Sequence, residues 1–201
     1  MTRSIVVVSA GLANPSSTRL LADQLATATD VALRSHGEAA DVSAIELREL
    51  AHPLVDHLLT GFPTGDLAEA IETVRHADGL IVVTPVFAAS YSGLFKMFFE
   101  VIEKDLLRGK PVLLAATAGT ARHSLVLEHA MRPLFSYLRA VTVPTAVFAA
   151  TEEFGGARSG EFAARMETAA GELADLVVGA PRAVPEDPFD TVTPFDQLLK
   201  G

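Results

Sequence analysis

Short, uninterrupted apolar runs separated by stretches of helical periodicity constrain this chain more than any other feature of its sequence. Segments 5–8, 79–84 and 110–116 are of strand length and consist mainly of valine, leucine, isoleucine and alanine. A strand without polar alternation is buried on both faces, as in a parallel sheet covered by helices. Between the first two runs, segment 16–35 repeats apolar residues at helical spacing and stops before Gly37. The sequence therefore predicts strands and helices in alternation, joined by right-handed crossovers.

Weaker patterns complete the expected fold. Strands are expected near 41–46 and at 141–150, where Pro144 suggests an edge or a bulge. Segment 52–63 fits either a loop or a short helix, and the remaining helices are expected at 66–76, 93–104, 121–139 and 161–178. The predicted fold is α/β, a three-layer sandwich with a five-stranded parallel sheet and helices on both faces, for which we take the order 2-1-3-4-5, one of the two common orders of such sheets. It would span residues 1–179, with a proline-rich C-terminal tail at 180–201.

Composition excludes several classes of function. The 25 acidic residues exceed the 16 basic ones, giving a formal charge of −9, which disfavours nucleic acid and acidic membranes as partners. There is no cysteine, so disulfides, thiolate nucleophiles and cysteine-ligated metals are excluded. The N-terminal apolar run is too short for a signal peptide, and no stretch reaches the ~18 apolar residues of a membrane helix. A cytoplasmic protein is expected.

The first candidate loop, 9–19, directly follows the first strand and opens a helix. Ligands in parallel sheets bind beyond the carboxyl ends of the strands, and a helix start attracts anions through its free amides and dipole. The hydroxyls of Ser9, Ser16, Ser17 and Thr18 could donate to a phosphate, and Arg19 could pair with it. The loop lacks both GxGxxG and GxxxxGK[ST], so the phosphate is not that of a dinucleotide or ATP. Ordinary helix capping by Ser16 or Ser17 is the alternative interpretation.

Two further loops follow the strands at 79–84 and 110–116. Loop 84–96 has small residues that let backbone approach a flat ligand, and its Phe87 and Tyr91 could stack on one or could instead seal the core. In loop 117–123, Gly119 permits a tight turn that exposes amides, with Thr120 as an expected helix cap.

These loops resemble the NAD(P)H-dependent FMN reductase family, which has a flavodoxin-like fold. The similarity is carried by Thr-Pro-Val-Phe-x-x-Ser-Tyr-Ser-Gly-Leu-Phe-Lys at 84–96 and Ala-Thr-Ala-Gly-Thr at 116–120. His-Ser-Leu at 123–125 and Met-Arg-Pro-Leu-Phe at 131–135 extend it, so that most of residues 3–178 is covered. The most similar pattern is that of reductases that feed reduced flavin to a separate, luciferase-like monooxygenase.

The resemblance implies a role for each loop. The first would hold the FMN phosphate, the second would hold the isoalloxazine edge chiefly through backbone, and the third would lie along the other side of the flavin. Arg122 and His123 would contact NAD(P)H, or would be a solvated surface pair. The candidate cofactor-binding residues are Ser9, Ser16, Ser17, Thr18, Arg19, Pro85, Val86, Phe87, Ser90, Tyr91, Ser92, Gly93, Thr117, Ala118, Gly119, Thr120, Arg122 and His123.

Two residues depart from the family pattern. The family often has an arginine before the serines of the first loop, whereas here Asn14 stands nearest and the arginine follows at Arg19. The family often has tyrosine after Pro-Val, and Phe87 keeps the stacking surface but lacks the hydroxyl.

Two features point to assembly. Helix 93–104 is apolar on more than one face, which suggests a subunit interface around Phe98, unless the helix is covered within its own core. Pro133 predicts a kink or a π-bulge in the helix at 121–139. His129 lies where the monooxygenase-partnered reductases have an inserted residue at a subunit interface, although a plain proline kink is the alternative. A dimer or tetramer is therefore expected.

The predicted function is hydride transfer from NADPH or NADH to FMN, with the reduced FMN passed to a partner monooxygenase. No catalytic side chain is assigned, because the cofactors carry the chemistry, and no metal site is expected, because no histidine has ligand spacing such as HExxH. The alternatives are an FMN-containing quinone, azo or metal-ion reductase, a flavodoxin-type electron carrier without an NAD(P)H site, and a regulatory flavin-binding module.

Overall fold

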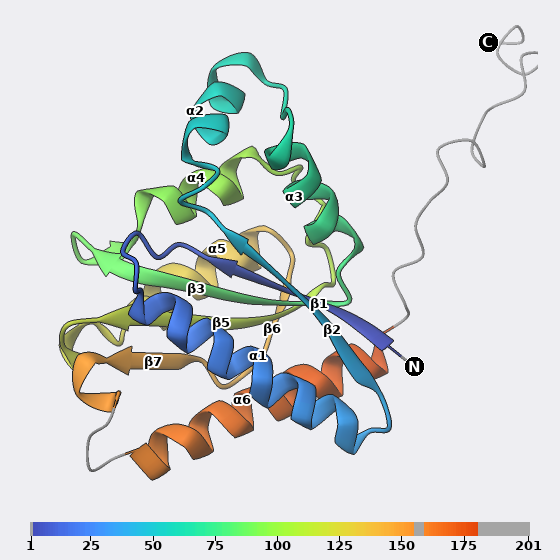
Figure 1. Ribbon diagram of the computed structural model, residues 1–201, viewed down its shortest axis with the longest axis vertical. Helices are drawn as coiled ribbons and strands as arrows, with labels where there is room; N and C mark the ends of the chain where they lie inside the picture. Colours follow the sequence, from blue (N-terminus) through green and yellow to red (C-terminus); the bar gives the residue numbers. More distant parts are fainter. Residues whose placement is uncertain (1, 155–158, 181–201) are drawn as a thin grey trace, which may run out of the picture.

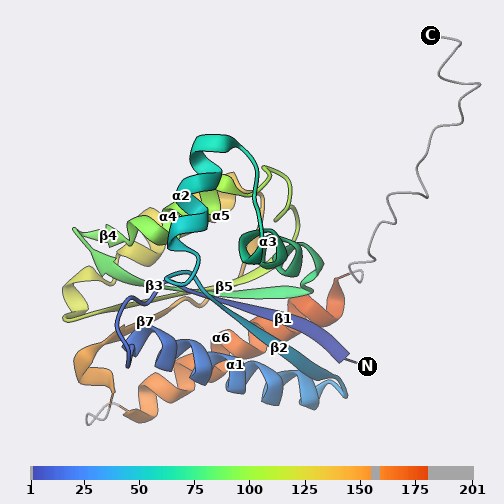
Figure 2. The same ribbon diagram turned by 45° about the horizontal axis from the view of Figure 1, so that its top comes forward.

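A computed structural model describes residues 2–154 and 159–180 and shows a three-layer α/β sandwich (Figures 1 and 2). The helices α1 (Ser17–Ser35) and α6 (Ser159–Gly179) cover one face of the sheet. The other face carries α2 (Ala51–Thr60), α3 (Asp66–His76), α4 (Gly93–Val101) and α5 (Arg132–Tyr137). Each face has its own apolar cluster. The predicted layers are confirmed.

The sheet runs in the order β2-β1-β3-β5-β6, with all of these neighbours parallel. This is the predicted order, and the uninterrupted apolar runs are its buried central strands. Seven strands are present, however, and not five. The strands are β1 (Thr2–Ser9), β2 (Ala39–Glu46), β3 (Gly79–Phe87), β4 (Ser90–Tyr91), β5 (Pro111–Ala118), β6 (Val141–Thr142) and β7 (Val147–Ala150).

The two extra strands have local causes. β4 is a short antiparallel addition to β3, in the loop that was expected to be irregular. β6 and β7 both pair with β5 and are two halves of the expected fifth strand. The interruption contains Pro144, which has no N–H for a ladder. There Arg132 donates to the carbonyls of Val143 and Pro144, both at 3.0 Å, so that side-chain bonds replace the missing ladder.

The expected continuous helix at 121–139 is instead three segments. A 3₁₀ turn, η1 (Ala121–His123), precedes a π-helix, η2 (Leu127–Met131), and α5 follows. Pro133 lies in the first turn of α5, immediately after the π-helix, so the predicted π-bulge is confirmed. His129 lies within the π-helix with its side chain exposed.

Helix α2 resolves the ambiguity at 52–63. Pro53 lies in the first turn, where the missing N–H costs nothing, and Gly61 closes the helix with a φ of 80°. Over the whole described range, 2–154 and 159–180, there is no helix both long and apolar enough to cross a bilayer.

The three phenylalanines of helix α4 are buried inside their own chain. Phe95 and Phe98 are fully buried, and the rings of Phe99 and Phe135 lie 4.8 Å apart between α4 and α5. The helix ends at Val101, three residues before the expected limit. The interpretation of Phe98 as an interface residue is therefore wrong, whereas Leu94, Met97 and Val101 on the same helix are only partly buried, so their place at an interface stays a prediction.

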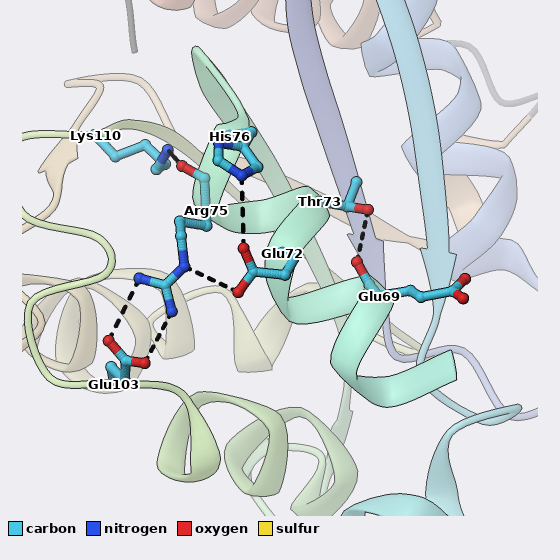
Figure 3. Close-up of polar contacts among 7 residues, drawn as sticks. All are labelled: Glu69, Glu72, Thr73, Arg75, His76, Glu103 and Lys110. Carbon is cyan, nitrogen blue, oxygen red and sulfur yellow. Dashed lines mark hydrogen bonds and ion pairs between the residues drawn. The ribbon is translucent and has the colours of Figure 1, made fainter. Parts of the chain in front are cut away.

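At the end of the sheet remote from the candidate loops, Lys110 closes the last turn of α3 (Figure 3). Its ammonium, almost buried, donates to the carbonyls of Arg75, at 3.1 Å, and Ala77. Arg75 in turn bonds Glu72 and Glu103 (Figure 3). Burial lowers the pKa of Lys110 to about 8, although the charge of Asp78 opposes this shift. The sheet thus ends on a desolvated cation bonded to helix carbonyls.

The depressed pKa of Lys110 predicts that stability rises with pH in an alkaline window. Between pH ~8 and ~10.5 the unfolded lysine keeps its proton while the folded one has lost it, so the free energy of unfolding increases by up to ~3 kcal/mol. Urea unfolding across this window should show the increase in wild type relative to Lys110→Met, which has no proton to lose. Parallel pH profiles for the two proteins would contradict the shift.

Candidate functional site

The three candidate loops meet at one edge of the sheet. Ser9 at the end of β1 is opposite Val83 of β3, and Pro85 of β3 is opposite Thr117 at the end of β5. Parallel strands place their carboxyl ends together, and β1 and β3 are neighbours although they are distant in sequence. The structure therefore brings the three predicted loops into one site.

The first loop ends on the start of helix α1. Ser16 caps this helix, its Oγ accepting from the Arg19 amide at 3.3 Å. A Cβ on Gly11 would lie 2.2 Å from that Oγ, so only glycine lets the loop pack so closely on the cap. Ser17 is exposed at the first helical position, and first-turn amides have no acceptor within a helix. Capping and anion binding are both compatible with this geometry.

Arg19 is held by two carboxylates. Its guanidinium contacts Glu46 at 2.6 Å and Asp23 at 2.7 Å. These hydrogen bonds, Glu46 first, raise the pKa of Arg19 despite partial burial. Pairing of Arg19 with a phosphate stays a prediction, and it would have to compete with both carboxylates.

Three of the predicted hydroxyl residues lie beneath the surface. Ser9 is fully buried, and its Oγ has no hydrogen-bond partner among the described residues. Thr18 and Thr117 are also buried, and their hydroxyls bond each other at 2.8 Å across 99 positions of sequence. Sequence reasoning selected all three as ligand contacts but could not find this bond, because neither loop contains a signal for its partner.

The second loop is a tight hairpin between β3 and β4. Ser92 caps helix α4 by accepting from the Phe95 amide at 3.2 Å, while its own amide donates to Thr84 Oγ1 at 3.0 Å. Phe87 is 48% exposed at the strand end, whereas the Tyr91 ring packs 5.8 Å from that of Phe95. Stacking on a ligand thus suits Phe87, and the core-sealing alternative describes Tyr91.

The turn of this hairpin is strained. Ala88 and Ala89 have φ of 48° and 66°, and both are exposed. This is the two-residue geometry that asparagine followed by glycine adopts readily and that alanine adopts at a cost of ~1 kcal/mol or more each.

Replacing this pair by Ala88→Asn with Ala89→Gly should therefore raise the free energy of unfolding by ~1–2 kcal/mol. Urea unfolding measures it. Ala13→Gly is the matched control, since Ala13 is exposed and does not have a positive φ. There the added freedom of glycine in the unfolded chain should lower the stability of the protein slightly. If the turn variant and Ala13→Gly changed the free energy of unfolding equally, the turn would be unstrained.

The third loop carries the exposed cation of the site. Thr120 Oγ1 accepts from the Arg122 amide at 3.4 Å, which confirms it as the cap of the following η1 turn. Arg122 and His123 are both exposed, and Arg122 forms no ion pair with any residue in 2–154 or 159–180. Its guanidinium, unlike that of Arg19, is available to an incoming anion.

With the site assembled, known proteins can be compared. Residues 3–155 match the family described as NADPH-dependent FMN reductase. The chain belongs to this family. An FMN reductase (NADPH) of Pseudomonas aeruginosa is 38% identical over 177 residues, which is 87% of this chain and 92% of that one. The NADH-dependent FMN reductase SfnE of Pseudomonas putida is 40% identical over 189 residues, or 90% of this chain and 95% of that one.

Solved structures agree with the FMN reductase assignment. An oxidoreductase of Corynebacterium diphtheriae has a TM-score of 0.87 and 53% identity, covering 90% of this chain and 99% of that one. The apo form of an NADH:FMN oxidoreductase has a TM-score of 0.75 and 26% identity, covering 93% and 92%. The family resemblance stated from the strand-end loops is confirmed.

The residues present fit FMN. The Arg19 amide is bonded to Ser16, but the Ser17 and Thr18 amides precede the first bond of the helix and suit a phosphate, and exposed Phe87 offers an aromatic face near the same strand ends. The Ser9 hydroxyl is buried and has no hydrogen-bond partner among the described residues. A phosphate bound at this loop could use that unsatisfied polar atom. Within the described residues, no group of three or more histidine, aspartate or glutamate side chains is placed to hold a metal.

Proposed function

We propose that this FMN reductase family member oxidises NADPH or NADH at the strand-end site and releases reduced FMN to a partner monooxygenase. The observation that carries the proposal is the junction of the three loops at the edge between β1 and β3, with the start of α1 on one side and Phe87 on the other. The relatives support either nicotinamide, since one is named for NADPH and another for NADH.

The protein's part is binding and orientation. Bound FMN supplies the hydride acceptor, and no side-chain acid or base is required for that transfer. The α1 start holds the phosphate, and the Phe87 ring holds one face of a flat ligand. Arg122, exposed on the third loop and without an ion pair among the described residues, draws the anionic nicotinamide nucleotide toward the same edge.

The test is oxidation of NADPH and of NADH by purified protein, followed by the absorbance of the reduced nicotinamide, with and without free FMN. A rate that saturates with added FMN is the expected result and gives the nicotinamide preference. Activity with FMN retained through turnover would instead favour a quinone, azo or metal-ion reductase. No oxidation despite bound FMN would replace the proposal by an electron carrier or a regulatory flavin-binding module.

We also infer a cytoplasmic homo-oligomer, a dimer or a tetramer. Leu125 and Tyr137, on either side of the π-helix in the sequence, are 63% and 68% exposed, and a subunit contact at the π-helix would cover them. Light scattering of the purified chain should give a mass above that of one 21.2 kDa chain.

A further inference from the structure

Among the described residues, the hydrogen bond between the hydroxyls of Thr18 and Thr117 is the one side-chain bond that directly joins the first candidate loop to the third. Thr18 comes from the first turn of α1, and Thr117 from the end of β5. Both are nearly inaccessible, with 2% and 3% of their surface exposed. A ligand on the surface would therefore meet the loops above this pair, and not the two hydroxyls themselves.

The pair is also the anchor of the phosphate-binding turn. Ser17 and Leu20 are exposed and Arg19 is half-buried, so Thr18 is the first buried residue of α1. The next is Leu21, which packs in the apolar cluster on this face of the sheet. Arg19 in the same turn is tied to Glu46 of β2 by a partly buried ion pair, so the Thr18–Thr117 bond is the fully buried side-chain tie of this turn ahead of Leu21.

We propose that Thr18 and Thr117 are positioning residues, which fix the phosphate-binding turn of α1 relative to the loop after β5 and so favour flavins that carry a phosphate. The inference rests on the proposed function, in which that turn holds the FMN phosphate. Strand β5 is the rigid partner, because it is paired with β3 on one side and β7 on the other. The helix start is the element that the bond holds in place.

The test compares FMN with riboflavin, which lacks the phosphate, in titrations of flavin fluorescence with purified protein. Thr117→Val keeps the shape of the side chain and removes the hydroxyl. We expect it to weaken FMN binding about 10-fold and riboflavin binding less than twofold, since a lost buried hydrogen bond is worth about that factor. Thr117→Ser keeps the hydroxyl and should restore FMN binding.

Two further variants separate positioning from general destabilisation. Thr29→Val removes another buried hydroxyl of α1, which donates to the Leu25 carbonyl at 2.8 Å but lies far along the helix from the site. It should leave the ratio of FMN to riboflavin affinity unchanged. Thr18→Val with Thr117→Val should bind FMN about as weakly as either single variant, because both remove one bond.

Wild-type affinity for FMN in Thr117→Val, or an equal loss for FMN and riboflavin, would overturn the inference. Failure of the proposed function has a different signature, since wild type itself would then bind no FMN or oxidise neither nicotinamide.

Discussion

Ser17→Asp should weaken FMN binding about 100-fold while leaving the fold intact. Ser17 is exposed at the first position of α1, where a carboxylate interacts favourably with the helix dipole, so stability should hold or rise slightly. A phosphate dianion bound to the same turn would lie ~5 Å from the new charge. With a dielectric constant between that of water and that of a protein interior, we expect a repulsion of ~3 kcal/mol. Fluorescence titration with FMN measures the loss.

Ser17→Asn is the matched control, with the same shape and no charge, and it should bind FMN within a few-fold of wild type. Riboflavin adds a second control, since it should bind Ser17→Asp almost normally. An unchanged FMN affinity in Ser17→Asp would mean that the phosphate binds elsewhere. Thr18 is unsuitable for the same experiment, because a carboxylate there would be buried against Thr117 and would destabilise the protein.

Phe98→Ala should lower the free energy of unfolding by ~3–5 kcal/mol, the range for truncating a buried phenylalanine. Phe98 is fully buried, and its ring lies 5.2 Å from that of Phe99 in an edge-on arrangement. The melting temperature of a domain of this size should fall by roughly 10 °C or more. Thermal unfolding and light scattering on one preparation measure stability and mass together.

Phe62→Ala is the control, since this ring is 74% exposed between α2 and α3 and its loss should change neither the mass nor the stability appreciably. If Phe98 were an interface residue, its truncation would dissociate subunits and leave the unfolding of each chain nearly unchanged. A lower mass with an unaltered melting temperature would therefore restore the interface interpretation.

The strand order was implied by the resemblance to a flavodoxin-like family and is confirmed. Sequence patterns predicted the central strands because buried parallel strands need continuous apolar runs, and a run such as 79–84 is visible without tertiary information. The same reasoning placed Phe98 at an interface, since an apolar residue looks the same whether its own chain or a second copy covers it. The split of the fifth strand was only half predicted. Pro144 signals the break, but the Arg132 guanidinium that bonds the freed carbonyls comes from another element.

The sequence by itself determined the α/β class, the positions of the central strands, the three strand-end loops and the family, since each depends on local periodicity or on residues close together in the chain. Tertiary structure alone decided which side chains of the first loop stay exposed and which are bonded within the protein. Ser17 stays exposed, Thr18 turns inward to Thr117, and Arg19 is taken by Glu46. Hydrogen bonds between side chains distant in sequence depend on how the helix sits on the sheet, and local patterns carry no record of that placement.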